Sequence, residues 1–94
     1  MQSKNKPRPT AAEARHIDFV KSQSCVVCGQ DGPSDCHEIE QGAWWTSIPL
    51  CQDCHMGSHN GIHGQKRIWL VQKLTELSAL NLFLGQVLTR LARR

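Results

Sequence analysis

The spacing of polar and apolar residues changes along this chain, and each change predicts a different element. Residues 1–9, MQSKNKPRP, contain two prolines and no apolar pattern, so we expect a disordered basic tail. Thr10 and Glu13 then form the T-x-x-E pattern of a helix capping box. Apolar residues follow at helical spacing, and the sequence therefore predicts a helix from Thr10 to about Lys21.

The middle of the chain is typical of short elements joined by turns. A C-x-x-C turn and a loop rich in Gly, Pro and Asp precede the segment CHEIE (36–40), which predicts a short strand. Residues 41–50 predict a turn and a second short strand that enters another C-x-x-C sequence. A short helix is expected from Gln52 to Asn60-Gly61, because Gly after Asn often ends a helix.

The C-terminal part, from about Gln65 to Arg93, has the period of one long helix. Leucine recurs at every seventh position and alternates with a second set of positions, as in a coiled coil. This pattern predicts a homodimer through the C-terminal helix. Further apolar residues widen the surface, however, so packing of the helix on its own domain is an equal alternative. The seven-residue series is Leu70, Leu77, Leu84 and Leu91; the alternate positions are Leu74, Asn81 and Leu88; the additional apolar residues are Leu80, Leu82, Phe83 and Val87.

The length of 94 residues predicts a single domain. We expect this domain to span residues 10–64 with a metal ion as a cross-link, preceded by the tail (1–9) and followed by the C-terminal helix (65–94). Domains of this size often need a metal or disulfide for stability. The formal charge is +3 and the basic residues gather at both ends, which is compatible with DNA binding but also with solvated tails. With no long apolar run and no leader pattern, we expect a soluble, cytoplasmic protein without a membrane partner.

The cysteines give the strongest chemical signal. Their number is five, and four of them form two C-x-x-C pairs, Cys25/Cys28 and Cys51/Cys54. An odd count in this spacing is typical of metal ligands rather than a disulfide framework. Two such turns can bring four thiolates around one Zn²⁺, and a closed Cys₄ site of this kind is structural. The alternatives are a redox dithiol or ordinary core cysteines.

Several histidines lie next to these cysteines in the sequence. His55 and His59 are four residues apart, so on a helix they would share one face and could bind one ion. His63 follows four residues later, past the expected helix end, and would have to approach from a loop. The alternative is a solvated histidine cluster. His37 lies in the first predicted strand, where alternation places it on the face opposite Cys36 and Glu38; a neutral imidazole there could accept a proton from water.

Together, C-x-x-C, the strand HEI and the segment IPLC-x-x-CH-x-x-x-H resemble the HNH (ββα-metal, His-Me finger) nucleases. Within that family the chain is similar to small phage and prophage proteins with a zinc-knuckle Cys₄ site, including the recombination-enhancement nucleases. The resemblance covers roughly residues 15–64. It implies an α+β fold with a small ββα-metal, treble-clef-like core, flanked by an N-terminal helix and a long leucine-rich C-terminal helix.

The resemblance also implies roles for individual residues. His37 would be the general base, and His55 and His59 would hold the catalytic ion, with His63 as a competitor. Cys36 stands at a metal-ligand position, where Glu38 is the alternative. The chain departs from the family near Thr46, where an Asn is expected, and in Cys36, which suits Zn²⁺ or another soft metal better than Mg²⁺.

The function expected from these features is a metal-dependent endonuclease that hydrolyses DNA phosphodiester bonds. It would carry structural Zn²⁺ and a second divalent ion, Mg²⁺, Mn²⁺, Zn²⁺ or Ni²⁺, for catalysis. Trp44 and Trp45 would either stack on bases or, as we prefer, bury at least one ring beneath the zinc site. The alternative function is a non-catalytic zinc module that binds DNA or protein, including a homodimeric adaptor.

Overall fold

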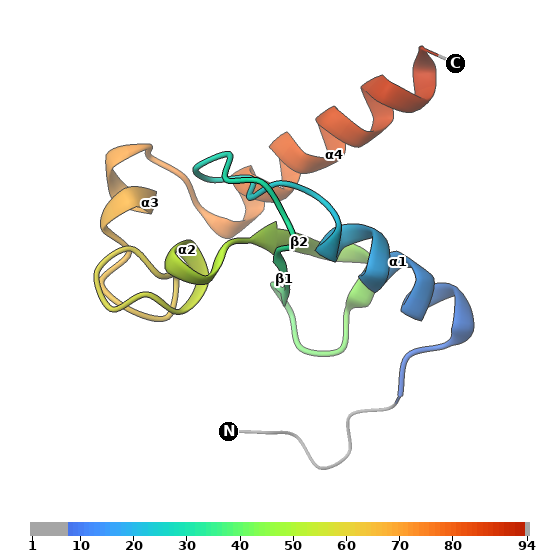
Figure 1. Cartoon of the computed structure of the whole chain (residues 1–94), viewed down its shortest axis with the longest axis horizontal. Coiled ribbons are helices and arrows are strands. Elements are labelled where there is room, and N and C mark those ends of the chain that lie inside the picture. The colour runs from blue at the N-terminus through green and yellow to red at the C-terminus, as the bar shows by residue number, and fades with distance from the viewer. Residues whose placement is uncertain (1–7, 94) are drawn as a thin grey trace.

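A two-stranded antiparallel sheet lies at the centre of the molecule, with the helices around it (Figure 1). The computed structural model describes residues 8–93, so most of the predicted N-terminal tail, and the last arginine, lie outside the described residues. The fold is α+β, as the sequence predicts. In chain order the elements are α1 (Ala11–Lys21), β1 (Asp35–Glu38), the 3₁₀ helix η1 (Trp44–Thr46), β2 (Ser47–Leu50), α2 (Gln52–Met56), α3 (Arg67–Val71) and α4 (Glu76–Ala92).

The predicted N-terminal helix and its capping box are confirmed in α1. The side chain of Thr10 accepts a hydrogen bond from the Glu13 N–H at 3.1 Å, and the Glu13 carboxylate accepts one from the Thr10 N–H at 2.8 Å. These bonds satisfy N–H groups that have no partner inside a helix. The helix then buries Val20 against the sheet.

Both predicted strands form, with bounds slightly different from those expected. The pairing of β1 with β2 sets Asp35 opposite Leu50 and His37 opposite Ile48. All four residues of β2 are buried, because α1 and α4 both pack on this strand. In β1 only His37 is buried, and its neighbours are partly exposed. The sheet therefore fixes His37 at the edge of the core.

The expected helix from Gln52 to Asn60-Gly61 is wrong at its C-terminal end, because α2 ends at Met56. Beyond Gly57 the chain folds back on α2 in a series of turns. A side chain at Gly61 or Gly64 would bring its Cβ within 2.5 Å of the Gly57 carbonyl oxygen. Backbone segments can approach this closely only where glycine is present, and this packing replaces the last turns of the predicted helix.

The single long C-terminal helix is also wrong, since the chain forms α3 and α4 with a break between them. Lys66, before α3, and Lys73, after it, both have left-handed backbone conformations with φ of 57°. Thr75 then starts α4 as its N-cap, and its side chain accepts a hydrogen bond from the Ser78 N–H at 3.1 Å. The apolar period continues across this break, so periodicity alone did not reveal it.

The break separates the heptad leucines between two helices. On α4 the buried face consists of Ala79, Leu80 and Phe83, which pack into the core. Homodimerisation through α4 stays a prediction. The exposed leucines of the seven-residue series are Leu70 on α3 and Leu77, Leu84 and Leu91 on α4, and Leu88 from the alternate positions is exposed as well. Among residues 8–93, no helix combines the length and apolar character needed to cross a bilayer.

Candidate metal centres on either side of α2

The four cysteines of the two C-x-x-C pairs converge in space. Their Sγ atoms all lie within 4.8 Å of one another, and those of Cys28 and Cys51 are 3.6 Å apart. Three of the four residues are buried, and Cys28 is exposed. The cysteines are free thiols in the structure rather than disulfides. The members of this group, the Cys₄ cluster, are Cys25, Cys28, Cys51 and Cys54.

Local backbone structure brings the two pairs together. Cys51 is the N-cap of α2, and its Sγ accepts a hydrogen bond from the Cys54 N–H at 3.4 Å. The first pair lies in a turn that ends at Gly29, which has a φ of 80°. The Val26 N–H donates to the Pro49 carbonyl at 3.0 Å and ties this turn to β2. The cluster therefore cross-links the turn, the sheet and α2.

Ionisation of all four thiols at such short distances is opposed unless a positive charge compensates it. Burial raises the pKa of the Cys28 and Cys54 thiols, and neighbouring cysteines raise them further. Burial also opposes ionisation of Cys25, but hydrogen bonds from nearby backbone N–H groups lower its pKa overall. A bound cation reverses this balance and deprotonates its thiol ligands. The cluster can thus hold a metal ion, and a closed set of four thiolates favours structural zinc.

A second group consists of three histidines from three different segments. His37 comes from β1, His55 from α2, and His63 from the turns that follow α2. Each offers a ring nitrogen, and these nitrogens lie within 4.8 Å of one another. The ring centroids are 5.0 to 5.3 Å apart. We call these residues the histidine cluster.

The turns after α2 explain why His63 rather than His59 joins this cluster. The Ile62 N–H donates to the Cys54 carbonyl at 2.9 Å, and the His63 N–H donates to the His55 carbonyl at 3.3 Å. The returning chain is therefore bound to α2 residue by residue. His59 is exposed and, within the part of the chain that the structure describes, belongs to neither cluster. The expectation that His55 and His59 share a helical face is wrong, because α2 has ended before His59.

Two of the three imidazoles are held by carboxylates. Asp35 Oδ2 lies 2.9 Å from His55 Nδ1, and Glu76 Oε2 lies 2.7 Å from His37 Nε2. An ionised carboxylate can only accept, so the ring nitrogens in these bonds carry hydrogen, and in the neutral imidazole the opposite nitrogen then has the lone pair. Carboxylate–histidine pairs of this kind orient the ligands of many metal sites. Neither acid is part of a ligand motif in the sequence, and Glu76 is too distant along the chain for any local pattern to reveal it.

The histidine cluster lines a cleft of about 870 Å³. Cys36 and Glu38, the alternative ligands from β1, also line this cleft but lie outside the group of three. The Glu38 carboxylate instead accepts a hydrogen bond from the Gly42 N–H at 2.7 Å, which fixes the turn after β1. The pKa of His63 is lowered by partial burial and then by the charges of His55 and His37. A lowered pKa favours the neutral imidazole, the form that binds metal ions.

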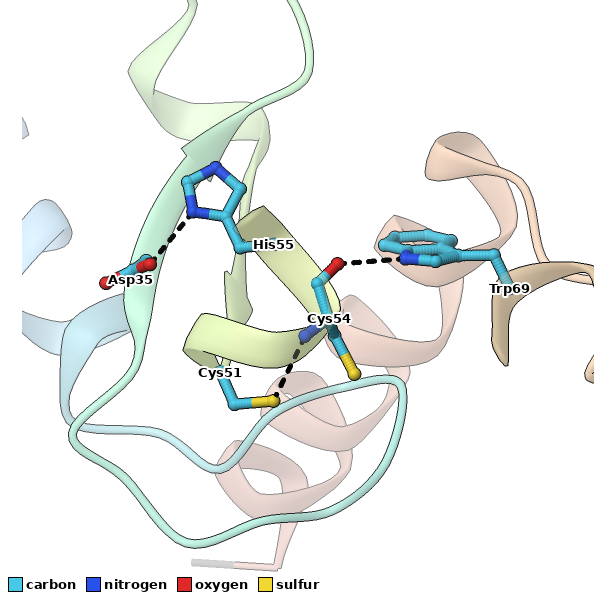
Figure 2. Close-up of polar contacts among 5 residues, drawn as sticks. All are labelled: Asp35, Cys51, Cys54, His55 and Trp69. Carbon is cyan, nitrogen blue, oxygen red and sulfur yellow. Dashed lines mark hydrogen bonds and ion pairs between the residues drawn. The ribbon is translucent and has the colours of Figure 1, made fainter. Parts of the chain in front are cut away.

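The helix α2 lies between the two centres. Figure 2 shows the His55 ring on the side of Asp35 and the sulfurs of Cys51 and Cys54 on the opposite side. The Trp69 indole N–H, from α3, donates to the Cys54 carbonyl at 3.0 Å. Trp69 is 1% exposed and is the buried indole beside the Cys₄ cluster.

The other two tryptophans, Trp44 and Trp45, belong to η1, which has no buried residue. Trp44 is partly exposed, and Trp45 is 54% exposed with its ring centroid 5.0 Å from that of His16 on α1. The expectation that one of these rings is buried beneath the zinc site is therefore wrong. Stacking of Trp45 on a nucleic-acid base stays a prediction.

No protein-family model, curated protein or solved structure matches this chain. The resemblance to HNH nucleases therefore stays a hypothesis that rests on the residue pattern.

Proposed function

We propose that this protein is a metal-dependent endonuclease of the HNH type that hydrolyses DNA phosphodiester bonds. The observation that carries the proposal is the histidine cluster: three imidazoles from separate segments share an open cleft, and carboxylates orient two of them. A cluster used only for stability would not need an open cleft. Its place beside a Cys₄ cluster is what a zinc-locked scaffold with a separate reactive ion requires.

In this proposal His55 and His63 hold a divalent ion. Asp35 accepts the Nδ1–H of His55 and leaves Nε2 as the nitrogen with a lone pair. His63 is kept neutral by its lowered pKa, so protons compete less for its ring. A bound divalent ion would supply positive charge beside the phosphate and stabilise the leaving oxygen.

His37 is the general base in the same proposal. It is 7% exposed, and its ring is fixed between the sheet and Glu76, so little motion is needed to present one nitrogen to the cleft. The ring accepts a proton from a water molecule, whose oxygen then attacks phosphorus as the bond to the leaving oxygen breaks. The formal charge of +3 is compatible with a DNA substrate.

The decisive test is cleavage of plasmid and single-stranded DNA in Mg²⁺, Mn²⁺, Zn²⁺ and Ni²⁺ by wild type, His37→Ala, His55→Ala and His59→Ala. Loss of the base should lower the rate about 10²- to 10⁴-fold, and loss of His55 should abolish cleavage or demand much more metal. His59→Ala is the matched control, because His59 is exposed and outside the histidine cluster, and it should cleave like wild type.

Two results would contradict the proposal. The first is a folded, zinc-loaded wild type that cleaves no DNA with any of the four ions, which would leave the non-catalytic zinc module. The second is cleavage at the wild-type rate by His37→Ala and His55→Ala as well as by His59→Ala, which would place the activity outside the histidine cluster.

A further inference from the structure

Glu76 brings the C-terminal part of the chain into the histidine cluster. Its Oε2 lies 2.7 Å from Nε2 of His37, although 39 positions separate the two residues. His37 is 7% and Glu76 34% exposed, so the pair lies at the boundary between the core and the cleft. Glu76 also lines the cleft. The resemblance to HNH nucleases covers only residues 15–64, so it assigns no role to this residue.

The position of Glu76 is set by the start of α4. Thr75 caps the helix, and Glu76 is its first residue. Behind it, Leu80 and Phe83 anchor α4 in the core, and α4 packs on β2, the strand paired with the one that carries His37. A negative charge in the first helical turn is favourable with respect to the helix dipole. The carboxylate is therefore held against His37 by a rigid element rather than by a loop.

We infer that Glu76 is the positioning residue of His37 and that α4 is thereby a part of the reactive centre. The carboxylate accepts the Nε2–H, which fixes the ring and selects the tautomer in which Nδ1 is free to accept a proton. This role rests on the proposed function, in which His37 is the base. Glu76 is not among the residues whose ligand atoms lie close enough together to share one ion, so we assign it to His37 rather than to the ion.

The structure contains the same arrangement a second time. Asp35 holds Nδ1 of His55 as Glu76 holds Nε2 of His37. Each carboxylate occupies one ring nitrogen and leaves the other to react. Removal of such partners in metal sites typically costs about 10- to 100-fold in metal affinity or activity, and we expect a loss of that size in cleavage when Glu76 is removed.

The test compares Glu76→Ala and Glu76→Gln with Glu40→Gln in the zinc-loaded full chain. The glutamine keeps an oxygen that can accept the Nε2–H, whereas alanine removes the acceptor. Glu40 is exposed and outside the residues that line the cleft, so its glutamine variant is a matched control for loss of one charge. Long-range ¹H–¹⁵N NMR reports which nitrogen of His37 carries hydrogen, and DNA cleavage reports kcat and KM.

We expect His37 to be the Nε2–H tautomer in wild type, Glu40→Gln and Glu76→Gln, and a mixture of tautomers in Glu76→Ala. The kcat should fall about 10- to 100-fold in Glu76→Ala, with little change in KM, and should be largely restored in Glu76→Gln. Thermal unfolding of each variant separates these effects from loss of fold. If Glu76→Ala does not fold, a tautomer mixture in Glu76→Gln would still overturn the inference.

The inference and the proposed function can fail separately. If His37→Ala is inactive while Glu76→Ala keeps the wild-type kcat and tautomer, the inference is wrong and the nuclease stands. If wild type cleaves nothing but Glu76→Ala alters the His37 tautomer, Glu76 positions the ring and the nuclease proposal is wrong.

Discussion

Trp69 is predicted to stabilise the packing of α3 on α2, the helix that contains Cys54 of the Cys₄ cluster. Its side chain is 1% exposed, and its indole N–H donates to the Cys54 carbonyl at 3.0 Å. The same carbonyl accepts a second hydrogen bond, from the Ile62 N–H at 2.9 Å. We consider two substitutions, Trp69→Phe, which removes the donor but keeps an aromatic ring, and Trp69→Ala, which removes the whole side chain.

The structure sets the magnitude of each effect. In Trp69→Phe the Cys54 carbonyl keeps its bond to Ile62, so the cost is that of one net hydrogen bond, about 1 kcal/mol, plus a small cavity. In Trp69→Ala a fully buried ring is lost, which typically costs about 3–5 kcal/mol. For a domain of this size 1 kcal/mol lowers the Tm by about 4–8 °C. Trp69→Ala should therefore lower the Tm several times as much as Trp69→Phe.

The assay is thermal unfolding of the zinc-loaded protein followed by circular dichroism. Trp45→Ala is the matched control, because Trp45 is 54% exposed and surface substitutions usually change stability by no more than about 0.5 kcal/mol. Equal and small effects of Trp69→Ala and Trp45→Ala would contradict this prediction, since they would mean that the Trp69 ring does not support the core.

Three further predictions concern zinc, protons and self-association. Purified protein should contain at least one tightly bound zinc ion by metal analysis. Removal of the zinc by a chelator should unfold the protein, because zinc binding coupled to folding contributes about 10–16 kcal/mol. A metal-free sample that stays folded by circular dichroism would contradict this. The lowered pKa of His63 means that its ring titrates below the ordinary 6.5 in protein with an empty histidine cluster. Around this pH the folded state therefore binds fewer protons at His63 than the unfolded state does. The neutral His63 ring contributes its full share of the folding free energy above pH 6.5, and this share is lost as the pH falls through the pKa of the folded state. An NMR titration midpoint of His63 at or above 6.5 would contradict this prediction. If α4 pairs between chains, Leu88→Glu should convert a dimer to a monomer in sedimentation experiments, since Leu88 is 58% exposed; a wild-type monomer at all concentrations would exclude it.

Local chemistry made several elements predictable. The capping box of α1 depends on two side chains three residues apart, and its hydrogen bonds form as the pattern indicates. The two short strands follow from the turn residues that flank them, and β2 also from its apolar residues Ile48 and Leu50. The Cys₄ cluster was predictable for the same reason. Each C-x-x-C is a local turn, and two such turns in a small chain are typical of a metal site.

The errors arose where the backbone turns or packs closely in ways that apolar periodicity does not report. The glycine packing that ends α2 depends on close approach of Gly57 to Gly61 and Gly64, which periodicity does not report. The C-terminal heptads continued across the break between α3 and α4, although the backbone turns there at Lys73. Trp69, not the paired tryptophans of η1, became the buried ring beside the cysteines.

Local sequence patterns were enough to indicate the helical and strand segments near the N-terminus, the four cysteine ligands, and His37 and His55 as candidate site residues. The packing of the folded chain, in contrast, brings His63 rather than His59 into the histidine cluster and sets Asp35 and Glu76 against the rings of His55 and His37. The physical reason is the range of the interactions. Capping bonds and C-x-x-C turns join neighbours along the chain, whereas the histidine cluster is assembled by backbone bonds to α2 and by the docking of α4 on the sheet.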